Sequence, residues 1–386
     1  MTAAGAGRLE PLDGLRGLAA LWVFAGHAVG MSGAAVPILG RPLLAVDLFM
    51  MLSGALMVYQ TGVRDPREPL ADPSTWVRFW LRRFFRIAPV FYLAFAVAMI
   101  MGPWQGEFRQ AIAMANDRGF DWARYNDQSP TNILMHLSFI FGLVPAYADR
   151  SPLPDWSIGL EMQFYLVFPF ILLLLRRIGF IAGSLLLLAG VGLLWLVVGD
   201  WMAAFSPSRP AALPLRLNIF LAGMLVMRAR DLTGRPRLGL AAAAVLLAVV
   251  PLNTVENPVE LVVRGLSVAV LAMAIIPGLI PSRLIEIPAG WGRAFLSWNP
   301  LRALGDVSYG VYLVHLLVLV PVVALVNGEL GGLPPLLRAV ISFSISAAVV
   351  YPLGWLLYRF VENPGIALGR SVVSRVGPRS PSQSPS

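Results

Sequence analysis

The chain contains no cysteine, no lysine and only three histidines, His27, His136 and His315. Without cysteine there is no disulfide framework, no thiol nucleophile and no metal site built on sulfur. Three separated histidines also argue against a histidine-rich metal site. We therefore expect no metal ion and no permanently bound cofactor. Arginine without lysine, beside abundant alanine, glycine and proline, is typical of a GC-rich bacterial genome.

Charge is scarce as well. Charged residues make up 13% of the chain and hydrophobic residues 57%, against about 25% and 45–50% in a typical soluble domain. A chain of 386 residues with so little charge cannot cover a soluble surface, and it is too apolar for disorder. An integral membrane protein is the class that remains. The net charge of +9 comes from arginines scattered between apolar runs, which indicates membrane topology and no nucleic-acid partner.

Long apolar runs are what the sequence does contain. A spanning helix needs about 20 mostly apolar residues, and ten runs qualify: 14–34, 43–61, 86–103, 158–175, 179–199, 212–227, 238–254, 261–280, 303–327 and 336–358. The segment 132–146 is apolar but short, so we interpret it as an interfacial or re-entrant piece. The sequence predicts an all-α polytopic bundle over residues 1–370 and a disordered cytoplasmic tail over 371–386.

The arginines give this bundle an orientation. If the N-terminus lies inside and ten spans alternate, 21 of the 30 arginines fall on the cytoplasmic side. The positive-inside rule then predicts both termini in the cytoplasm of a bacterial cytoplasmic (inner) membrane. The longest outer segment, 104–157, carries six acids that could cap or line a site on that face: Glu107, Asp117, Asp121, Asp127, Asp149 and Asp155.

Polar residues inside the first run are the first site candidates, because ionisable groups are costly in a membrane. Arg16 and His27 are eleven residues apart, so on a helix they differ by about 20° and share a face some 16 Å long. Both can line one long cleft, and Asp13 could pair with Arg16. In the structural alternative, Arg16 extends its charged end to the inner membrane surface and His27 hydrogen-bonds to a neighbouring backbone carbonyl. His27 and Arg16 interrupt the apolar run, so we interpret it as a span rather than a cleaved signal peptide.

The second and third runs add candidate binding residues. Asp47 stands near the start of the second run and could bind substrate or cap the helix. Ser53 precedes Gly54, a pair that also favours close helix packing. At the mouth of the third run the candidates are three arginines whose forks suit phosphate, although they could equally anchor the helix to anionic lipid: Arg82, Arg83 and Arg86.

Two further runs carry polar groups. Glu161 lies about one turn into the fourth run and needs a cationic or hydrogen-bonding partner, so a structural ion pair and a catalytic role are both open. In the string at 305–315, Ser308, Tyr312 and His315 follow i, i+4, i+7 spacing and share a face, with Tyr309 beside them. This polar ridge is either an interhelical hydrogen-bond seam or part of a substrate site.

In this arrangement the chain resembles the bacterial integral membrane acyltransferase-3 family. The resemblance runs along nearly the whole chain and begins with Arg16 and His27, separated by ten residues. It continues through DLFMMLSG (47–54), RRFFRIAP (82–89), WSIGLEMQFYLVFP (156–169), VSYGVYLVH (307–315) and FVENP (360–364).

The resemblance implies transfer of an acyl group, most often acetyl, from cytoplasmic acyl-CoA to a hydroxyl of a carbohydrate or similar small acceptor. Acyl-CoA would be a co-substrate. By the family's motifs, His27 and Arg16 match the essential pair, Arg83 and Arg86 match arginines associated with the donor, and Glu161 matches the acid after tryptophan–serine. Histidine suits a general base for a sugar hydroxyl, because its pKa lies near working pH.

The chain departs from the family's pattern in two places: Met162 follows the glutamate, and Phe49-Met50 stands where paired phenylalanines are usual. We also expect no appended esterase-like domain, so a separate extracytoplasmic partner could complete transfer to the acceptor. Besides these partners we expect membrane lipid. A transporter or flippase of a lipid-linked sugar is the alternative function, because many spans with buried charges suit that class equally well.

Overall fold

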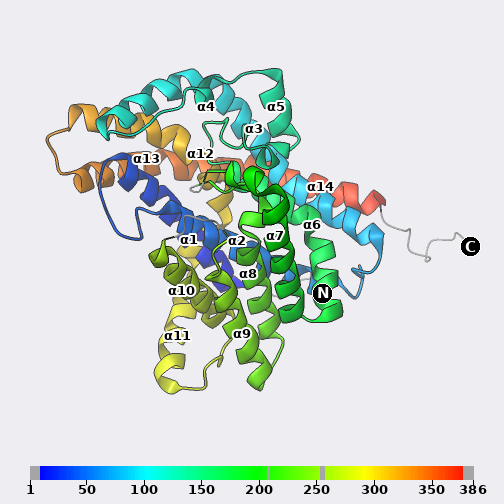
Figure 1. Cartoon of the computed structure of the whole chain (residues 1–386). Coiled ribbons are helices and arrows are strands. Elements are labelled where there is room, and N and C mark those ends of the chain that lie inside the picture. The colour runs from blue at the N-terminus through cyan, green and yellow to red at the C-terminus, as the bar shows by residue number, and fades with distance from the viewer. Residues whose placement is uncertain (1–8, 207–208, 253–256, 377–386) are drawn as a thin grey trace, which may run out of the picture.

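The computed structural model describes residues 9–206, 209–252 and 257–376, and every regular element within these ranges is helical. Ten of the described helices carry the apolar runs and form most of the bundle shown in Figure 1. They are α1 (Glu10–Met31), α2 (Pro42–Arg64), α3 (Pro73–Ala115), α6 (Trp156–Ile178), α7 (Phe180–Ala203), α8 (Leu217–Arg230), α9 (Gly234–Ala248), α10 (Pro258–Ile275), α12 (Asn299–Glu329) and α13 (Pro335–Leu357). The other elements of the described residues are α4 (Ala123–Asn126), α5 (Pro130–Leu137), η1 (Ile140–Leu143), η2 (Leu213–Leu215), α11 (Arg283–Leu296), η3 (Tyr358–Glu362) and α14 (Asn363–Val376).

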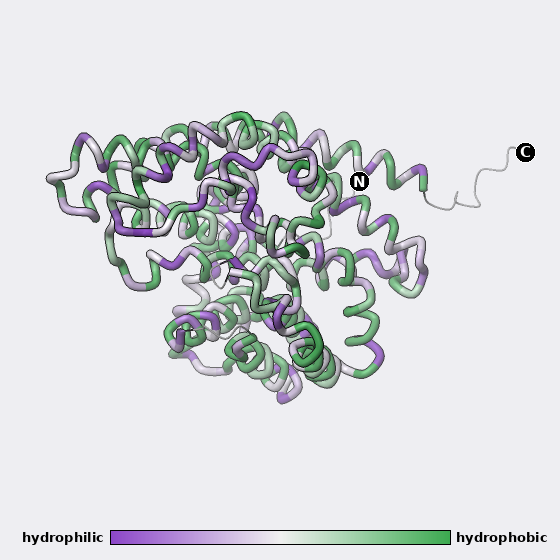
Figure 2. Tube along the Cα trace, turned by 45° about the horizontal axis from the view of Figure 1, so that its top comes forward, coloured by the Kyte–Doolittle hydropathy of each residue, from purple (hydrophilic) through white to green (hydrophobic). Residues whose placement is uncertain are grey.

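Each of the ten predicted spans thus falls on a separate helix. Figure 2 shows hydrophobic residues along much of the helical bundle. Among the described residues, seven helices are long and apolar enough to cross a membrane. Helix α1 is not one of these seven, because Arg16 and His27 lower its hydropathy, and α8 and α9 have only 14 and 15 residues. The all-helical membrane fold is thus confirmed, whereas the count of ten spans and the cytoplasmic termini stay predictions.

Helix α3 extends well beyond the span expected from the sequence. Helix α3 has 43 residues, far beyond the expected span of 86–103, and it continues through Pro89 and Pro103. A proline removes only one backbone donor, and neighbouring helices can satisfy the carbonyl that is freed. The segment 132–146 divides into α5 and η1, both too short to span.

The expected disordered tail is also partly helical. Residues 371–376 belong to α14, where we expected disorder from 371 onward, and residues 377–386 lie outside the described residues. Helix α14 packs along α3, and a Cβ added at Gly369 would lie 2.7 Å from the Cβ of Phe85. This close packing against α3 gives the helix a tertiary partner that its polar sequence does not reveal.

Helices α1 and α2 lie at the centre of the molecule, between α3, α12, α13 and α14 on one side and α8 to α11 on the other (Figure 1). Helix α1 packs mainly on α12, and α2 on α8. Two glycines allow these contacts: a Cβ at Gly305 would lie 2.0 Å from the carbonyl oxygen of Asp13, and one at Gly54 would lie 2.2 Å from that of Phe220. Gly54 therefore serves close packing, as its sequence context favoured.

A buried ion cluster ties α2 to α10 and α8. Asp47 Oδ2 accepts a hydrogen bond from Arg264 Nε at 2.6 Å, and Asp47 Oδ1 lies 3.7 Å from Arg216 Nε. All three residues are at most 1% exposed. A carboxylate held by two arginines at this depth satisfies charges that neither water nor lipid can reach. The placement supports a structural role for Asp47 in the packing of three helices.

The orientation can be checked with reporter fusions. We expect fusions at Arg64, Arg230 and Ser386 to report a cytoplasmic location and a fusion at Asp121 to report the outside, because this arrangement follows from the arginine distribution. Paired alkaline phosphatase and green fluorescent protein fusions give opposite signals on the two sides. A cytoplasmic signal at Asp121 would contradict the ten-span arrangement.

Candidate active site

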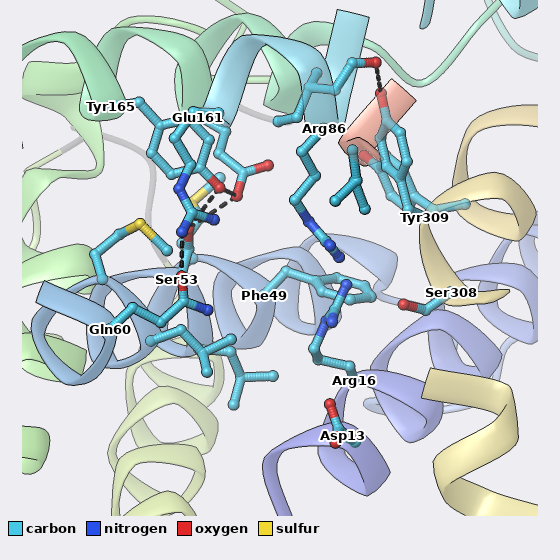
Figure 3. A pocket seen from close by; sticks show the side chains of 18 of the residues that line it. Asp13, Arg16, Phe49, Ser53, Gln60, Arg86, Glu161, Tyr165, Ser308 and Tyr309 are labelled. Carbon is cyan, nitrogen blue, oxygen red and sulfur yellow. Dashed lines mark hydrogen bonds between the residues drawn. The ribbon is translucent and has the colours of Figure 1, made fainter. Parts of the chain in front are cut away.

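A cavity of about 710 Å³ opens between α1, α2, α3, α6, α12 and α14. This volume lies within the range of about 300–1,000 Å³ that is typical of small-molecule sites. Nine of the thirteen residues proposed from the sequence line it: Asp13, Arg16, Ser53, Arg83, Arg86, Glu161, Ser308, Tyr309 and Tyr312. The fold therefore brings together polar residues from five separate parts of the chain, and Figure 3 shows several of them.

Arginines dominate the charge of this pocket. Its lining contains five arginines and three acids, and Figure 3 shows the guanidinium groups of Arg16 and Arg86 pointing toward one another. Arg86 Nη2 lies 3.3 Å from Glu362 Oε1, and the Glu362 side chain is 1% exposed. Two guanidinium groups that face each other repel unless an anion lies between or beside them. The pocket is therefore suited to a ligand with negative charge.

The other two arginines of the α3 cluster differ in their surroundings. Arg83 donates to the side-chain amide oxygen of Gln60 and lies over the ring of Tyr165, with 5.5 Å from its Cζ to the ring centroid. Arg82 lies outside the pocket lining, where both of its terminal nitrogens donate to Glu68, at 3.1 and 2.6 Å. The sequence grouped Arg82 with Arg83 and Arg86, but only the latter two reach the cavity.

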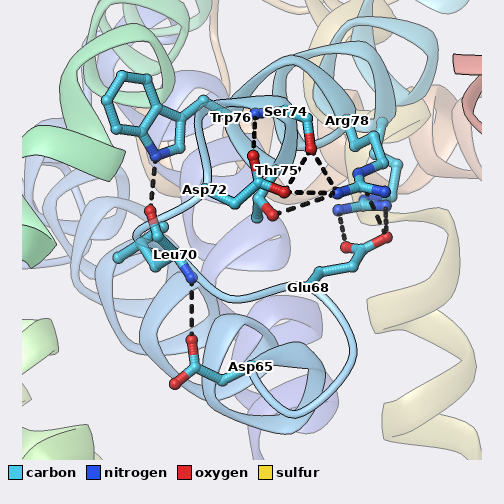
Figure 4. Close-up of polar contacts among 9 residues, drawn as sticks. Asp65, Glu68, Leu70, Asp72, Ser74, Thr75, Trp76 and Arg78 are labelled. Atoms are coloured by element: carbon cyan, nitrogen blue, oxygen red, sulfur yellow. Dashed lines mark hydrogen bonds and ion pairs between the residues drawn. The ribbon is translucent and has the colours of Figure 1, made fainter. Parts of the chain in front are cut away.

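The loop between α2 and α3 organises this end of the pocket (Figure 4). Asp72 caps α3 by accepting a hydrogen bond from the Ser74 backbone N–H at 2.8 Å. Arg78, one turn further on, lies 3.9 Å from Glu68, the acid that Arg82 also binds. These contacts fix the first turns of α3 and thereby the direction in which its arginines leave the helix.

Glu161, on α6, belongs to a compact hydrogen-bond network beside Arg83. Its Oε1 accepts hydrogen bonds from Ser53 Oγ, at 2.8 Å, and from the Tyr165 hydroxyl. Ser53 Oγ also lies 3.2 Å from the Tyr165 hydroxyl oxygen. The network joins α2 to α6 and holds the carboxylate at the cavity surface, as Figure 3 shows. A carboxylate fixed in this way can orient a ligand or the neighbouring Arg83 by its charge.

Two tyrosines of α12 line the pocket. The Tyr312 hydroxyl donates to the Pro154 carbonyl at 2.8 Å and lies 2.6 Å from Ser157 Oγ, which must then be the donor to Tyr312. The Tyr309 hydroxyl donates to the Ile87 carbonyl at 2.8 Å. Both tyrosines thus use their polar ends to tie α12 to other segments and turn their rings toward the cavity.

The two remaining candidates, His27 and His315, lie outside the cavity lining but contact each other. His27 Nδ1 and His315 Nε2 are 3.0 Å apart, and the ring centroids are 5.1 Å apart. The Tyr312 ring connects this pair to the pocket, with 6.0 Å between its centroid and that of His315. Arg16 and His27 therefore do not line one continuous cleft as expected, because the described lining includes only Arg16.

The third histidine belongs to the segment 104–157. His136 lies between the rings of Phe95 and Phe141, its Nδ1 donates to the Asn132 carbonyl at 2.9 Å, and its Nε2 lies 3.5 Å from Asp155 Oδ2. Burial raises the pKa of the Asp155 carboxyl, and the nearby His136 opposes this rise. None of the six acids of the segment 104–157 is in the described pocket lining.

Several pocket residues were not proposed from the sequence. The lining also includes Gln60, Arg64, Asp306 and Arg370. Arg370 stands seven residues after Asn363, so both fall on one face of α14, a signal hidden by the assignment of a disordered tail just beyond it. Glu362, which holds Arg86, lies within the string FVENP that carried the family resemblance, although no role had been given to it.

These features define an integral membrane protein with an arginine-rich pocket inside its helical bundle. The chain belongs to the acyltransferase-3 family, because the family model described as an acyltransferase domain matches residues 10–359. The resemblance seen in the motifs is thereby confirmed. Family membership also supports an O-acyltransferase over a transporter.

Several relatives align with most of this chain, and two of them are described here. The peptidoglycan O-acetyltransferase OatA of Listeria monocytogenes is 28% identical over 370 residues, which cover 92% of this chain and 55% of that protein. The acyltransferase MdmB of Streptomyces mycarofaciens is 27% identical over 403 residues, covering 94% of this chain and 92% of its own length. The chain thus spans about half the length of the Listeria relative. No solved structure matches it.

Proposed function

We propose that this protein transfers an acyl group, most simply acetyl, from acyl-CoA to a hydroxyl of a carbohydrate, with His27 as the general base. We place it in the bacterial cytoplasmic membrane with the donor entering from the cytoplasm. The observation that carries the proposal is the pocket lined by five arginines, next to a histidine pair, in a chain of an acyltransferase family.

The donor end of the proposal rests on charge. The phosphates of coenzyme A are bound best by planar guanidinium forks, which match phosphate oxygens at two points. Arg16 and Arg86 face each other in the pocket (Figure 3), and Arg83, on the same helix as Arg86, also lines it. We assign these three arginines to the donor phosphates, and we assign Glu161 to orienting the donor or Arg83.

The acceptor end rests on the histidines. A sugar hydroxyl is a weak nucleophile, so a base must take its proton as it attacks the acyl carbon. His27 is partly exposed, whereas His315 is fully buried, so His27 is the member of the pair that an acceptor can reach. The acyl group would then pass the ring of Tyr312, which touches both the pocket and the pair. A carbohydrate acceptor agrees with the name of the Listeria relative, a peptidoglycan enzyme.

The function can be tested with purified protein in nanodiscs. Acetyl-CoA and a bacterial cell-envelope glycan are added, free thiol is measured, and O-acetyl ester on the glycan is measured by mass spectrometry. We expect thiol release that depends on the glycan and a matching gain of ester. Movement of an intact lipid-linked sugar across the bilayer with no thiol release would favour a flippase. Thiol release without ester on the glycan would point to a separate extracytoplasmic partner.

We predict that Arg83→Ala and Arg86→Lys each raise the apparent Kd for acetyl-CoA by about 10-fold or more, since a charge-assisted hydrogen bond contributes about 1.5–3 kcal/mol. Lysine keeps the charge of Arg86 but loses the two-point fork. Affinity is measured by calorimetry in nanodiscs, where topology is already fixed. Arg67→Lys, on an exposed loop residue outside the pocket lining, is the matched control. Unchanged affinity in both pocket variants would reduce the pair to a lipid anchor.

A further inference from the structure

The contact between His27 and His315 joins two helices that are distant in sequence. We propose that His315 is a positioning residue that holds His27 in the tautomer with its proton on Nδ1, so that Nε2 is free to act as the base. This inference rests on the proposed function, because it assigns His315 a role through His27. It also separates His315 from the substrate-binding group in which its spacing with Ser308 and Tyr312 had placed it.

The direction of the proton follows from the partners of each ring nitrogen. His315 Nδ1 lies 2.6 Å from the Tyr312 carbonyl oxygen. A carbonyl can only accept, so His315 carries its proton on Nδ1, and Nε2 of the neutral ring is an acceptor. His27 Nδ1, 3.0 Å from that Nε2, must then be the donor. The neutral His27 ring is left with an unprotonated Nε2, the state that a general base requires.

Packing around His315 holds the two histidine rings in contact. His315 is 0% exposed, and the ring of Phe24, one turn before His27, packs on it with centroids 5.5 Å apart. The close approach of α1 to α12, which Gly305 permits, brings the two histidines within reach of each other. Because His315 is buried and bonded through both nitrogens, it has no free position for a ligand, and it can act only through its neighbour.

The groups around the pair are few among the described residues. Carbonyls of the same helices, Val23 for His27 and Val311 for His315, lie near the rings and can only accept. Arg109 and Arg124 are the charged side chains whose fields reach His27. Among the side chains of the described residues, the hydrogen-bond partner of His27 Nδ1 is the neutral His315 ring rather than a carboxylate. A neutral partner leaves the imidazolium without an adjacent negative charge, so His27 returns its proton readily after transfer.

The step that this tautomer serves balances without a further reagent. The hydroxyl oxygen of the acceptor attacks the acyl carbon, and its proton moves to His27 Nε2. As the carbon–sulfur bond of the thioester breaks, the coenzyme A sulfur leaves with the electron pair. It takes up that proton from His27, which thereby returns to its neutral form. Throughout, His27 Nδ1–H stays hydrogen-bonded to His315 Nε2, which fixes the ring plane.

The test uses the fact that the chain has only three histidines. Full-length protein labelled with ¹⁵N-histidine is reconstituted in nanodiscs, and the ring nitrogen shifts, assigned with His27→Gln and His315→Phe, report each tautomer directly. Two variants separate the bonds of His315. His315→Asn keeps a donor near Nδ1 for the Tyr312 carbonyl but has nothing at the position of Nε2. His315→Gln places an amide oxygen near Nε2 that can accept from His27.

We expect His27 to be the Nδ1–H tautomer in the wild type and in His315→Gln, and a mixture of both tautomers in His315→Asn. Acyl transfer should follow: kcat falls about 10–100-fold in His315→Asn, less than the full contribution of about 10²–10⁴ that a general base supplies, because the base itself remains. The KM for acetyl-CoA stays within about 2-fold, because a bond inside the histidine pair acts on the proton transfer rather than on donor binding. His315→Gln restores most of kcat.

The outcomes distinguish this inference from the proposed function. If the His27 tautomer is unchanged in His315→Asn, the Val23 carbonyl suffices to set it and the positioning role is overturned. The role is also overturned if His315→Gln is as inactive as His315→Asn while its His27 keeps the Nδ1–H tautomer. If the tautomer shifts in His315→Asn but kcat does not, His315 positions His27 as we infer, and it is the assignment of His27 as base that fails.

Discussion

His27→Ala is expected to abolish acyl transfer while the protein still inserts and folds. A general base contributes about 10²–10⁴-fold to the rate, and a tenfold change corresponds to about 1.4 kcal/mol. His27 is the partly exposed member of the histidine pair, and its side chain bonds only to His315 among the side chains of the described residues. Alanine therefore removes the base with little loss of packing. The measurement is turnover of acetyl-CoA with acceptor in nanodiscs.

The control for this variant comes from the same helix turn. A Cβ added at Gly30 meets nothing within 4 Å, so Gly30→Ala changes α1 three residues from His27 without disturbing a contact. Elution volume and thermal unfolding of both variants show whether the fold is kept. Turnover of His27→Ala within about 3-fold of the wild type, in protein of normal stability, would remove His27 from the chemistry, because a base contributes at least about 10²-fold.

The sequence predicted the helices better than it predicted their partners. Apolar runs identify spanning helices because the bilayer sets their length, and all ten runs fall on helices of the structure. Periodicity also placed Arg16 and Tyr312 on polar faces, Glu161 was singled out as an acid inside a span, and these residues meet in the cavity. The ends of α3 and α14 were missed, because prolines and polar residues are tolerated where another helix packs against them.

Pairing across the bundle could not be predicted in this way. The spacing of Arg16 and His27 gives their angle on α1, but it does not show that Tyr312 lines the cavity beside Arg16 while its ring lies 6.0 Å from that of His315. His27 and His315 are 288 positions apart, and no local pattern indicates that they touch. Arg216 and Arg264 gave a signal that went unused: each lies inside a predicted span, where an arginine requires an acidic or polar partner.

The division that results has a consequence for the mechanism. In the proposed function, the arginines assigned to the donor phosphates line the pocket, and His27, the proposed base, lies outside that lining, so donor binding and proton transfer would depend on different residues. Variants of Arg86 should therefore act on the affinity for acetyl-CoA, and variants of the histidines on kcat. Tyr312, bonded to Pro154 and Ser157 at the start of α6, lines the pocket and also has its ring 6.0 Å from that of His315.

Asp47→Ala is expected to destabilise the protein by about 3–5 kcal/mol, because removal of one partner from a buried ion cluster leaves charge without compensation. The carboxylate lies 2.6 Å from Arg264 and 3.7 Å from Arg216, and none of the three is more than 1% exposed. Three helices lose their common contact. The measurement is the thermal unfolding midpoint and the yield of monodisperse protein in detergent.

A second acid beside α2 supplies the matched control for Asp47→Ala. Asp65 pairs with Arg176 at 3.1 Å, but the two side chains are 38% and 35% exposed. An exposed pair contributes only about 0–1 kcal/mol, so Asp65→Ala should unfold close to the wild type. Equal midpoints for the two variants would show that the buried cluster is dispensable. If Asp47→Ala instead folds normally and binds acetyl-CoA at least 10-fold more weakly, Asp47 belongs to the binding site that its position in the sequence first indicated, and the packing role assigned to it here fails.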